Sequence, residues 1–322
     1  MPQVQTELTH DLAMVADLLR TRQQDGHEPP LVQVTPQESL ERELKVLTSR
    51  QSFVSVTRAS DRVLGVASWT PLAWDSEQLG MPAARVDLLV SSGGYLEALE
   101  RKSALLRTIT DECRMRGIRY LTARVPASDL SGINALGRGG FELVDGILTF
   151  SKRVEDAAPP PASNGFEVRP FESRDLEQLL SIARSAYTCD RFHADRTLAP
   201  GVADRLYSAW VARSCRGEEA DAVIVAAKHG RVMGYVTCKL SFDSGSGAAP
   251  RVGTVVLVAT ADHARGQGVG SATLRGAMDW FRQQGVETVE VGTQMQNVAA
   301  CRLYENNGFR MTRMSLTFRR LL

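Results

Sequence analysis

A glycine-rich segment, Arg265-Gly266-Gln267-Gly268-Val269-Gly270, follows an apolar run from Thr254 to Thr260. The stretch after it is amphipathic, with apolar side chains at Leu274, Ala277, Met278 and Phe281. This order predicts a strand, a tight turn and a helix. Because such a turn leaves backbone N–H groups unpaired at the positive end of the helix, it is suited to receive a pyrophosphate. We therefore expect a phosphate-bearing cofactor at this turn.

A second group of polar residues follows a strand pattern from Glu287 to Thr293. Tyr304 stands seven residues after Asn297 in a predicted helix, so the two lie on one helix face, two turns apart. The two segments match R/Q-x-x-G-x-G/A and N-x-x-A-x-x-x-Y-x-x-x-G-F in order and separation, and here the chain resembles the GNAT superfamily of N-acetyltransferases.

The resemblance implies an α/β (α+β) fold in which a mixed, mostly antiparallel sheet is flanked by helices. It also implies acetyl-CoA as the cosubstrate, with no metal. The strand that ends at Val258, Ala259 and Thr260 is expected to splay from its neighbour and to bind the pantetheine arm and the thioester carbonyl through its backbone. The other residues expected to contact the cofactor are Arg265, Gly266, Gln267, Gly268, Val269, Gly270, Ser271, Asn297 and Tyr304.

The family uses a tyrosine at the position of Tyr304 to protonate or hydrogen-bond the departing sulfur. An unperturbed tyrosine has a pKa of about 10 and an unperturbed thiol has a pKa of about 8.5, so complete proton donation is slightly uphill. We therefore expect Tyr304 to donate a hydrogen bond to the developing thiolate. Glu290 and Asp262 are local candidates for the base that accepts the amine proton.

The chain is a tandem repeat. Ser103, Ala104, Leu106 and Arg107 recur 168 residues later as Ser271, Ala272, Leu274 and Arg275, and Gly140-Phe141 and Leu148-Thr149-Phe150 recur as Gly308-Phe309 and Leu316-Thr317-Phe318. We expect a first GNAT-like domain at 1–152, a proline-rich linker at 153–164 and a catalytic domain at 165–322. Predicted opening helices lie at 8–20 and 175–187, and predicted strand pairs at 53–57 with 63–69 and at 222–227 with 232–240.

The same offset indicates which half binds the cofactor. Arg265, Gly268 and Gly270 correspond to Glu97, Glu100 and Lys102, and Asn297 and Tyr304 correspond to Asp129 and Leu136. Two carboxylates without glycine would obstruct the backbone amides and repel a pyrophosphate. We expect the first half to be a scaffold that contributes part of the acceptor pocket.

A narrower resemblance is to the dTDP-fucosamine acetyltransferases, which acetylate the 4-amino group of dTDP-4-amino-4,6-dideoxygalactose. The matching segments include Arg191-Phe192 through Trp210, Gly234-Tyr235-Val236, Thr293 to Asn297, Trp74 with Asp75 and Gly80, and Gly140 to Gly146. In the last of these the family has a glutamate that is proposed to accept the amine proton, and Asp145 stands there, one methylene shorter, so that a path through water is expected.

The resemblance also suggests the residues that bind the acceptor. Aromatic side chains could stack on a nucleotide base or a pyranose ring, and an arginine could pair with a diphosphate. The candidates are Arg191, Phe192, Tyr207 and Trp210. Because roughly seventy extra N-terminal residues complete the first repeat, where that family has a shortened one, the sugar isomer stays open. Two alternatives also stay open: acetylation of another small amine, as by mycothiol synthase, and a non-catalytic module that binds acetyl-CoA.

Composition limits the partners and the compartment. The 322 residues carry a net charge of +1 with no basic run, so we expect no nucleic-acid or membrane partner. Five cysteines without a C-x-x-C pair favour reduced thiols, and the N-terminal sequence lacks signal-peptide features, which indicates a cytoplasmic protein. The expected partner is a small-molecule amine, and monomer and homodimer remain equally open.

Overall fold

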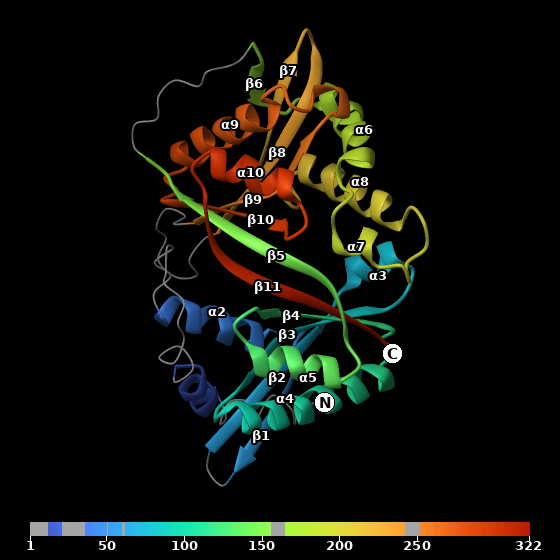
Figure 1. Cartoon of the computed structure of the whole chain (residues 1–322), viewed down its shortest axis with the longest axis vertical. Coiled ribbons are helices and arrows are strands. Elements are labelled where there is room, and N and C mark those ends of the chain that lie inside the picture. The colour runs from blue at the N-terminus through green and yellow to red at the C-terminus, as the bar shows by residue number, and fades with distance from the viewer. Residues whose placement is uncertain (1–11, 21–35, 50, 60–61, 156–164, 242–251) are drawn as a thin grey trace. The chain divides into compact units, whose positions relative to one another are not determined.

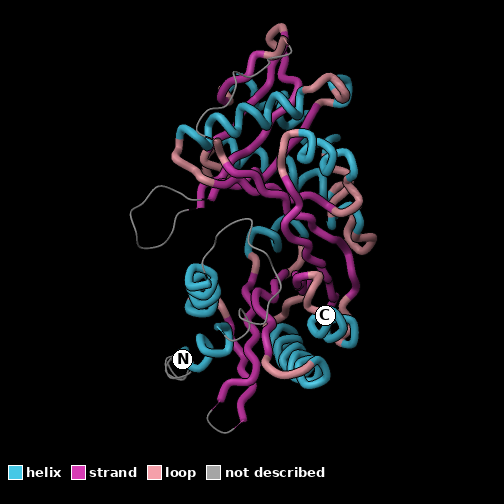
Figure 2. The backbone as a smooth tube through the Cα atoms, turned by 60° about the vertical axis from the view of Figure 1, so that its left-hand side comes forward, coloured by secondary structure: helices cyan, strands magenta, loops and turns pink. Residues whose placement is uncertain are grey.

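The computed structural model describes residues 12–20, 36–49, 51–59, 62–155, 165–241 and 252–322. The chain forms two compact units (Figures 1 and 2). Unit 1 comprises Met1–Gly146 and Met314–Leu322, and unit 2 comprises Ile147–Arg313.

Unit 1 is built on a sheet with the strand order β1-β2-β3-β4-β11. Its strands are β1 (Phe53–Ala59), β2 (Arg62–Pro71), β3 (Ala83–Ser91), β4 (Tyr120–Pro126) and part of β11 (Arg310–Leu321). Only β3 and β4 pair in parallel among these neighbours. The helices of unit 1 comprise residues 12–20, α2 (Pro36–Thr48), α3 (Ala73–Leu79), α4 (Tyr95–Met115) and α5 (Leu130–Arg138).

Helices cover both faces of the unit 1 sheet, as Figure 2 shows. Successive strand residues point to opposite faces, so Val66 packs with Leu19 and Leu40 while its neighbour Ala67 packs with residues of α4 and α5. Leu106 of α4 belongs to this second cluster. The two apolar clusters hold the sheet between two helical layers.

Unit 2 has the strand order β5-β10-β9-β8-β7-β6. Its strands are part of β5 (Glu142–Arg153), β6 (Glu167–Pro170), β7 (Ala222–Lys228), β8 (Arg231–Ser241), β9 (Val252–Thr260) and β10 (Thr288–Gln294). Only β9 and β10 pair in parallel among the neighbours whose register is described. The helices are η1 (Ser173–Asp175), α6 (Leu176–Ala186), α7 (Arg191–Ala194), α8 (Val202–Cys215), η2 (Asp262–Ala264), α9 (Val269–Gln283) and α10 (Val298–Asn306).

The helices of unit 2 also divide between the two sheet faces. A Cβ built on Gly234 of β8 would lie 2.7 Å from Val269, so this position faces α9. The next residue, Tyr235, faces the other way and its hydroxyl lies 3.1 Å from that of Tyr187, which follows α6. Thus α9 lies on one face, and α6 lies on the opposite face.

The predicted repeat is confirmed at the level of secondary structure. β4 and β10, α5 and α10, and β5 and β11 correspond at the 168-residue offset at both ends. The predicted strand pairs form β1–β2 and β7–β8, and the opening helix of the second half is α6. The first predicted helix is described from residue 12 onward, because its start lies outside the described residues.

The two halves exchange their final strands. Residues Ile147–Arg153 of β5 pair with β10 in unit 2, and Ser315–Leu321 of β11 pair with β4 in unit 1. The compact units therefore divide the chain at 146/147 and 313/314, whereas the sequence division falls in the linker. The repeat itself hides the exchange, because both final strands carry Leu-Thr-Phe and fit either partner. Residues 156–164 of the predicted linker lie outside the described residues.

Candidate active site

The turn before α9 has the backbone geometry expected of an anion-binding loop. Gly266 and Gly268 have φ values of 75° and 87°, in the left-handed region that favours glycine. Gly268 caps α9, and no side chain accepts a hydrogen bond from the first turn of this helix. The first N–H groups of a helix have no intrahelical acceptors. The N-terminus of α9 thus offers uncapped donors to a ligand.

Two side chains of the turn bond to its own residues. Arg265 forms an ion pair with Asp262 at 2.8 Å, and Gln267 donates a hydrogen bond to the carbonyl of His263 at 2.9 Å. Both charged side chains of the ion pair are more than half exposed. Asp262, a candidate base, thus contacts a loop residue. The guanidinium of Arg265 remains accessible at the turn.

The third glycine and the serine after it contact α10 and the turn that follows it. A Cβ on Gly270 would lie 3.0 Å from Leu303, so glycine allows the close approach of α9 and α10. Ser271 accepts a hydrogen bond from the side chain of Asn307 at 2.9 Å. These two predicted cofactor residues thus also have a packing role.

The predicted splay of the central strands is present. β9 and β10 pair only from Val252↔Thr288 to Val255↔Val291, although both strands continue beyond this register. Residues Val258, Ala259 and Thr260 pair on their other edge with β8. Their backbone edge toward β10 is left without a strand partner. The pairing ends at Val255, ten residues before Arg265.

Asn297 and Tyr304 lie on α10, as predicted. Asn297 caps the helix by accepting a hydrogen bond from the N–H of Ala300 at 3.1 Å. Tyr304 is buried to 4% exposure, with its ring centroid 5.6 Å from that of Phe150. Burial raises the pKa of Tyr304 above its usual value, and no described residue forms a hydrogen bond with its hydroxyl. Tyr304 is therefore neutral, and its O–H is available as a donor.

Comparisons with known proteins agree with this geometry. Residues 176–309, which include the turn, the split and α10, match the model of the Acetyltransferase (GNAT) family. The chain carries a GNAT acetyltransferase domain. This assignment fits the relatives, several of which are named acetyltransferases.

Three relatives of the acetyltransferase cover much of the chain. The spore coat polysaccharide biosynthesis protein SpsD of Bacillus subtilis (strain 168) is 28% identical over 78% of this chain and 81% of its own length. A dTDP-fucosamine acetyltransferase of Escherichia coli O6:H1 is 27% identical over 58% and 75%. A mycothiol acetyltransferase of Propionibacterium freudenreichii subsp. shermanii is 22% identical over 81% and 85%.

A solved structure shares the fold of the whole acetyltransferase. The tandem GNAT protein from the clavulanic acid biosynthesis pathway superposes with a TM-score of 0.58 at 16% identity, over 96% of this chain and 94% of its own. At this identity the likeness concerns the fold alone. The fold class, a mostly antiparallel mixed sheet with flanking helices in each half, is confirmed.

In unit 1 of the acetyltransferase an internal ion pair stands where unit 2 has Gly270 and Asn297. Lys102, at 6% exposure, donates to Asp129 at 2.6 Å and to Ser131 at 2.9 Å. Burial opposes ionisation of Asp129, but Lys102 and the N–H of Gly132 hold its pKa below the usual value. Asp129 caps α5 as Asn297 caps α10. The cap is common to both halves, while the ion pair with Lys102 is found in unit 1.

One detail of the sequence comparison was wrong. Residues 97–102 do not form the turn before the helix, because α4 begins at Tyr95 and has Gly94 as its cap. At the fixed offset of 168 residues, Arg101 is the equivalent of Val269, but α4 starts at Tyr95, six residues earlier. A comparison without gaps could not show this difference. A Cβ on Gly93 would collide with the carboxylate of Glu97 and the guanidinium of Arg101. Glu97 thus places an internal negative charge at this helix end, which disfavours a second anion.

The predicted acceptor residues gather around α8. The rings of Tyr207 and Tyr187 stack with centroids 4.2 Å apart, and Trp210 lies parallel to Tyr207 at 6.1 Å. Tyr207 is buried and Trp210 is half-buried. Arg191 lies over the ring of buried Phe192 at 4.5 Å. The four predicted residues therefore share the region of α7 and α8.

Sequence reasoning missed a histidine in this region. The Nδ1 of His193 lies 2.5 Å from Asp190, and its Nε2 lies 3.3 Å from Asp204. Asp190 is buried and also accepts hydrogen bonds from the N–H groups of Phe192 and His193. The Asp-x-x-His spacing of Asp190 and His193 can be read in the sequence. The contact of His193 with Asp204 of α8 cannot be read there, because Asp204 lies eleven residues further along the chain.

The other candidate bases have different surroundings. Glu290 of β10 forms an ion pair with Arg313 at 2.9 Å. Asp145 of β5 is buried to 5% exposure within unit 1 and has interactions of its own. Among the described residues no group of three or more His, Cys, Asp or Glu could hold a metal ion. In the same described part of the chain no helix has the length and apolarity needed to cross a membrane.

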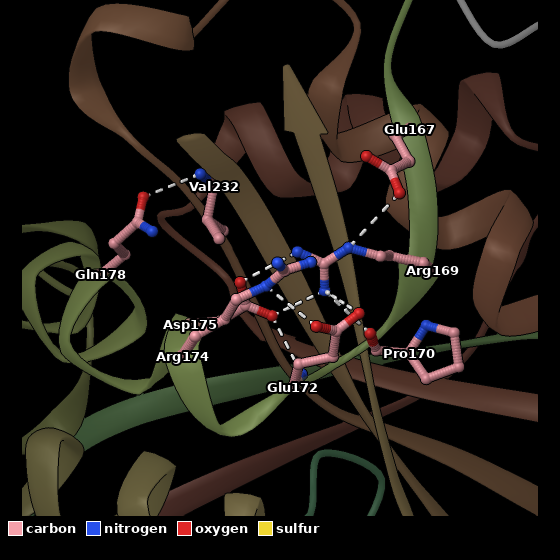
Figure 3. A network of polar contacts seen from close by, with 8 residues as sticks. All are labelled: Glu167, Arg169, Pro170, Glu172, Arg174, Asp175, Gln178 and Val232. Atoms are coloured by element: carbon pink, nitrogen blue, oxygen red, sulfur yellow. Dashed lines mark hydrogen bonds and ion pairs between the residues drawn. The ribbon is translucent and has the colours of Figure 1, made fainter. Parts of the chain in front are cut away.

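A polar network fixes the start of α6 and hence the approach to Tyr187. Arg169 of β6 donates to both carboxylate oxygens of Asp175, at 2.6 and 2.9 Å (Figure 3). Asp175 also accepts from the N–H of Glu172, and Gln178 of α6 accepts from the N–H of Val232 on β8. The network joins β6 and β8 to the first turn of α6.

Proposed function

We propose that this acetyltransferase transfers the acetyl group of acetyl-CoA to the amino group of a nucleotide-linked amino sugar such as dTDP-4-amino-4,6-dideoxygalactose. The uncapped N-terminus of α9 with Gly266 and Gly268 fits a pyrophosphate. The unpaired edge of β9 at Val258–Thr260 fits an extended amide-bearing arm. Acetyl-CoA, when bound there, would supply the activated acetyl group.

The residues of unit 2 can carry out what acetyl transfer requires. Backbone N–H groups at the split of β9 and β10 can stabilise the negative charge that develops on the carbonyl oxygen. The neutral hydroxyl of Tyr304 can donate a hydrogen bond to the departing sulfur. Asp145, the base suggested by the sequence resemblance, belongs to unit 1, and its role stays a prediction. The pH profile of turnover in Asp145→Asn tests this prediction, and an unchanged profile excludes it.

The acceptor class rests mainly on the aromatic region around α8. The relatives support it: one is named dTDP-fucosamine acetyltransferase, and another is named as a polysaccharide biosynthesis protein. Tyr187 and Trp210, which stack on buried Tyr207, provide flat apolar surface, and Arg191 provides a cation in the same region. Rings and phosphates are the groups that such side chains bind.

The test is a panel of acceptors assayed by CoA release with acetyl-CoA. We expect kcat/KM for dTDP-4-amino-4,6-dideoxygalactose to exceed that for simple primary amines by about 100-fold, which corresponds to about 2.7 kcal/mol of extra binding in the transition state. Equal rates with simple amines, or no turnover of any dTDP-amino sugar, would exclude the proposed acceptor.

A second candidate is acetylation of a pseudodisaccharide amine of the mycothiol type. This candidate is supported by the extent of the match, because the similarity to the relative named mycothiol acetyltransferase covers 81% of this chain and 85% of that protein. The same panel separates the two candidates when it includes that amine. For either substrate, a small nucleotide- or sugar-derived metabolite, we propose a cytoplasmic location.

A further inference from the structure

Two tyrosine hydroxyls meet in unit 2, and a third tyrosine lies on α10. Tyr187 follows α6, Tyr235 lies on β8 and Tyr304 lies on α10. The hydroxyls of Tyr187 and Tyr235 are 3.1 Å apart. Tyr235 is fully buried, whereas the ring of Tyr187 is half-buried. The ring of Tyr187 therefore has both a fixed hydroxyl and an accessible surface.

The position of this group is set by the split in the sheet. Tyr235 pairs with Ala259, beyond the last residue at which β9 and β10 pair, and its side chain points to the face that carries α6. The side chain of Gln296, just before α10, donates to the carbonyl of Cys189 at 3.4 Å and links the two segments. Tyr187 and Tyr235 thus reach the split from the face opposite α9.

Burial keeps the hydroxyls of these tyrosines protonated. Burial is the main reason that the pKa of Tyr187 lies well above its usual value, and the neighbouring Tyr235, Tyr207 and Tyr304 raise it further. Burial likewise raises the pKa of Tyr235. All three hydroxyls of the group are therefore neutral near pH 7, and each carries a hydrogen.

The hydrogen bonds within the group do not use all of its hydrogens. The contact between Tyr187 and Tyr235 uses one, since one hydroxyl must donate and the other accept. Neither the remaining hydrogen of this pair nor that of Tyr304 has an acceptor among the described residues. A ligand that brings acceptors can therefore use these hydrogens without breaking the contact between Tyr187 and Tyr235.

We propose that the hydroxyl pair of Tyr187 and Tyr235 is a specificity subsite that hydrogen-bonds a hydroxyl group next to the reacting amine of the acceptor. The other donors already have partners in the reaction: Tyr304 serves the sulfur, and the backbone edge of Val258–Thr260 serves the carbonyl. The subsite rests on the proposed function in that it assumes acetyl transfer at the split. The subsite favours acceptors that carry an uncharged hydroxyl group on the carbon next to the reacting amine, as amino sugars do.

Because the ring of Tyr187 stacks on Tyr207, its hydroxyl can be removed without removing the ring contact. The two rings lie 4.2 Å apart and are 15° from parallel, so Tyr187→Phe keeps the stack and removes only the hydroxyl. The probes are trans-2-aminocyclohexanol and cyclohexylamine, which differ by one hydroxyl beside the amine. Initial rates of CoA release with acetyl-CoA give kcat/KM for each.

We expect the wild type to prefer the amino alcohol by about tenfold, the size of one good hydrogen bond. Tyr187→Phe should abolish this preference by slowing the amino alcohol, while its rate with cyclohexylamine stays within about twofold. Tyr235→Phe should act in the same direction. The matched control is Tyr95→Phe, which removes a hydroxyl bonded to Asn134 in unit 1 and should leave the preference intact. Melting temperatures verify that each variant is folded.

The proposal is overturned if wild type and Tyr187→Phe show the same preference, if both probes slow equally in the variant, or if wild-type protein acetylates neither amine. These outcomes are independent of the nucleotide-sugar panel. If the preference for the amino alcohol depends on Tyr187 but no dTDP-amino sugar is acetylated, the subsite stands and the proposed acceptor is rejected. If a dTDP-amino sugar is acetylated and Tyr187→Phe leaves its rate unchanged, the acceptor stands and the subsite is rejected.

Discussion

Single residues distinguish the two halves of this tandem protein at the place where we predict a cofactor in one of them. In unit 2, Gly270 packs against Leu303, and Asn297 caps α10. In unit 1 the equivalent positions hold Lys102 and Asp129, which form a buried ion pair at 2.6 Å. Removing one partner of such a pair leaves an uncompensated buried charge. We therefore expect the loss of either partner, Lys102 or Asp129, to destabilise unit 1.

Tyr304 is the residue whose substitution should separate chemistry from binding. Tyr304→Phe keeps the ring contacts with Phe150 and Phe309 and removes the neutral donor. We expect kcat to fall by about 100-fold, as for loss of one transition-state hydrogen bond, while the Kd for CoA changes less than about threefold. Steady-state kinetics with calorimetric CoA binding provide the measurement. An unchanged kcat would remove Tyr304 from the mechanism.

At the scale of elements, helix termini and strand ends position the site. The split of β9 and β10 and the uncapped start of α9 are backbone features, so side-chain substitutions alter them only by filling or charging them. The equivalent region of unit 1 has the same strand split, since β3 and β4 pair only from Ala83↔Tyr120 to Val86↔Ala123. Both α4 and α9 start at a glycine without a side-chain cap, but α4 starts six residues earlier in the repeat and carries Glu97 in its first turn.

Charge at the cap of α9 should control cofactor binding. Asp and Asn enter the left-handed region more readily than most residues and share the strain of a φ of 87° at Gly268, whereas only Asp brings a carboxylate to the positive end of the helix. We expect Gly268→Asp to raise the Kd for CoA by at least about tenfold. The neutral control is Gly268→Asn, and the matched control is Gly201→Asp at the left-handed cap of α8, with φ 77°. Equal CoA affinity in all three variants would contradict a pyrophosphate site here.

The ion pair of Arg169 and Asp175 should stabilise unit 2 at pH values above the pKa of an unfolded aspartate, about 4. The hydrogen bond from Arg169 lowers the pKa of Asp175, so its stabilisation is present above the unfolded value of about 4 and disappears as pH falls through the lower, folded value. We expect Asp175→Asn to lose about 3 kcal/mol at pH 7 and progressively less below pH 4.

Thermal unfolding across this pH range measures the effect of Asp175→Asn. The control is Asp279→Asn, which breaks a partly exposed pair with Arg282 and should cost less than about 1 kcal/mol. A loss from Asp175→Asn that does not depend on pH would show that the pair acts through packing alone.

At the scale of the whole molecule, exchange of final strands makes the halves interdependent. Neither half of the sequence contains the complete sheet of its own unit, because β5 and β11 each contribute to the unit of the other half. Separately produced fragments 1–155 and 165–322 should each lack a strand partner and expose an unpaired edge.

Coexpression of the two fragments tests this dependence. We expect them to copurify at equal stoichiometry and to retain CoA binding, and we expect each fragment alone to aggregate. A tagged fragment pull-down followed by size-exclusion chromatography provides the measurement. A fragment 165–322 that is monomeric and binds CoA with wild-type affinity would show that the exchanged strand is dispensable.

The sequence by itself determined the features that depend on local backbone chemistry. The turn at Arg265–Gly270, the helix cap at Asn297, the position of Tyr304 and the repeat follow from residue types at fixed spacing, because glycine, caps and apolar periodicity act within a few residues. Only the tertiary structure decided the early start of α4, the exchange of β5 and β11, the Asp190–His193–Asp204 contacts and the hydroxyl pair of Tyr187 and Tyr235. These depend on partners distant in sequence, among strands with the same Leu-Thr-Phe pattern and aromatic residues with several available neighbours, and pattern alone does not select between such partners.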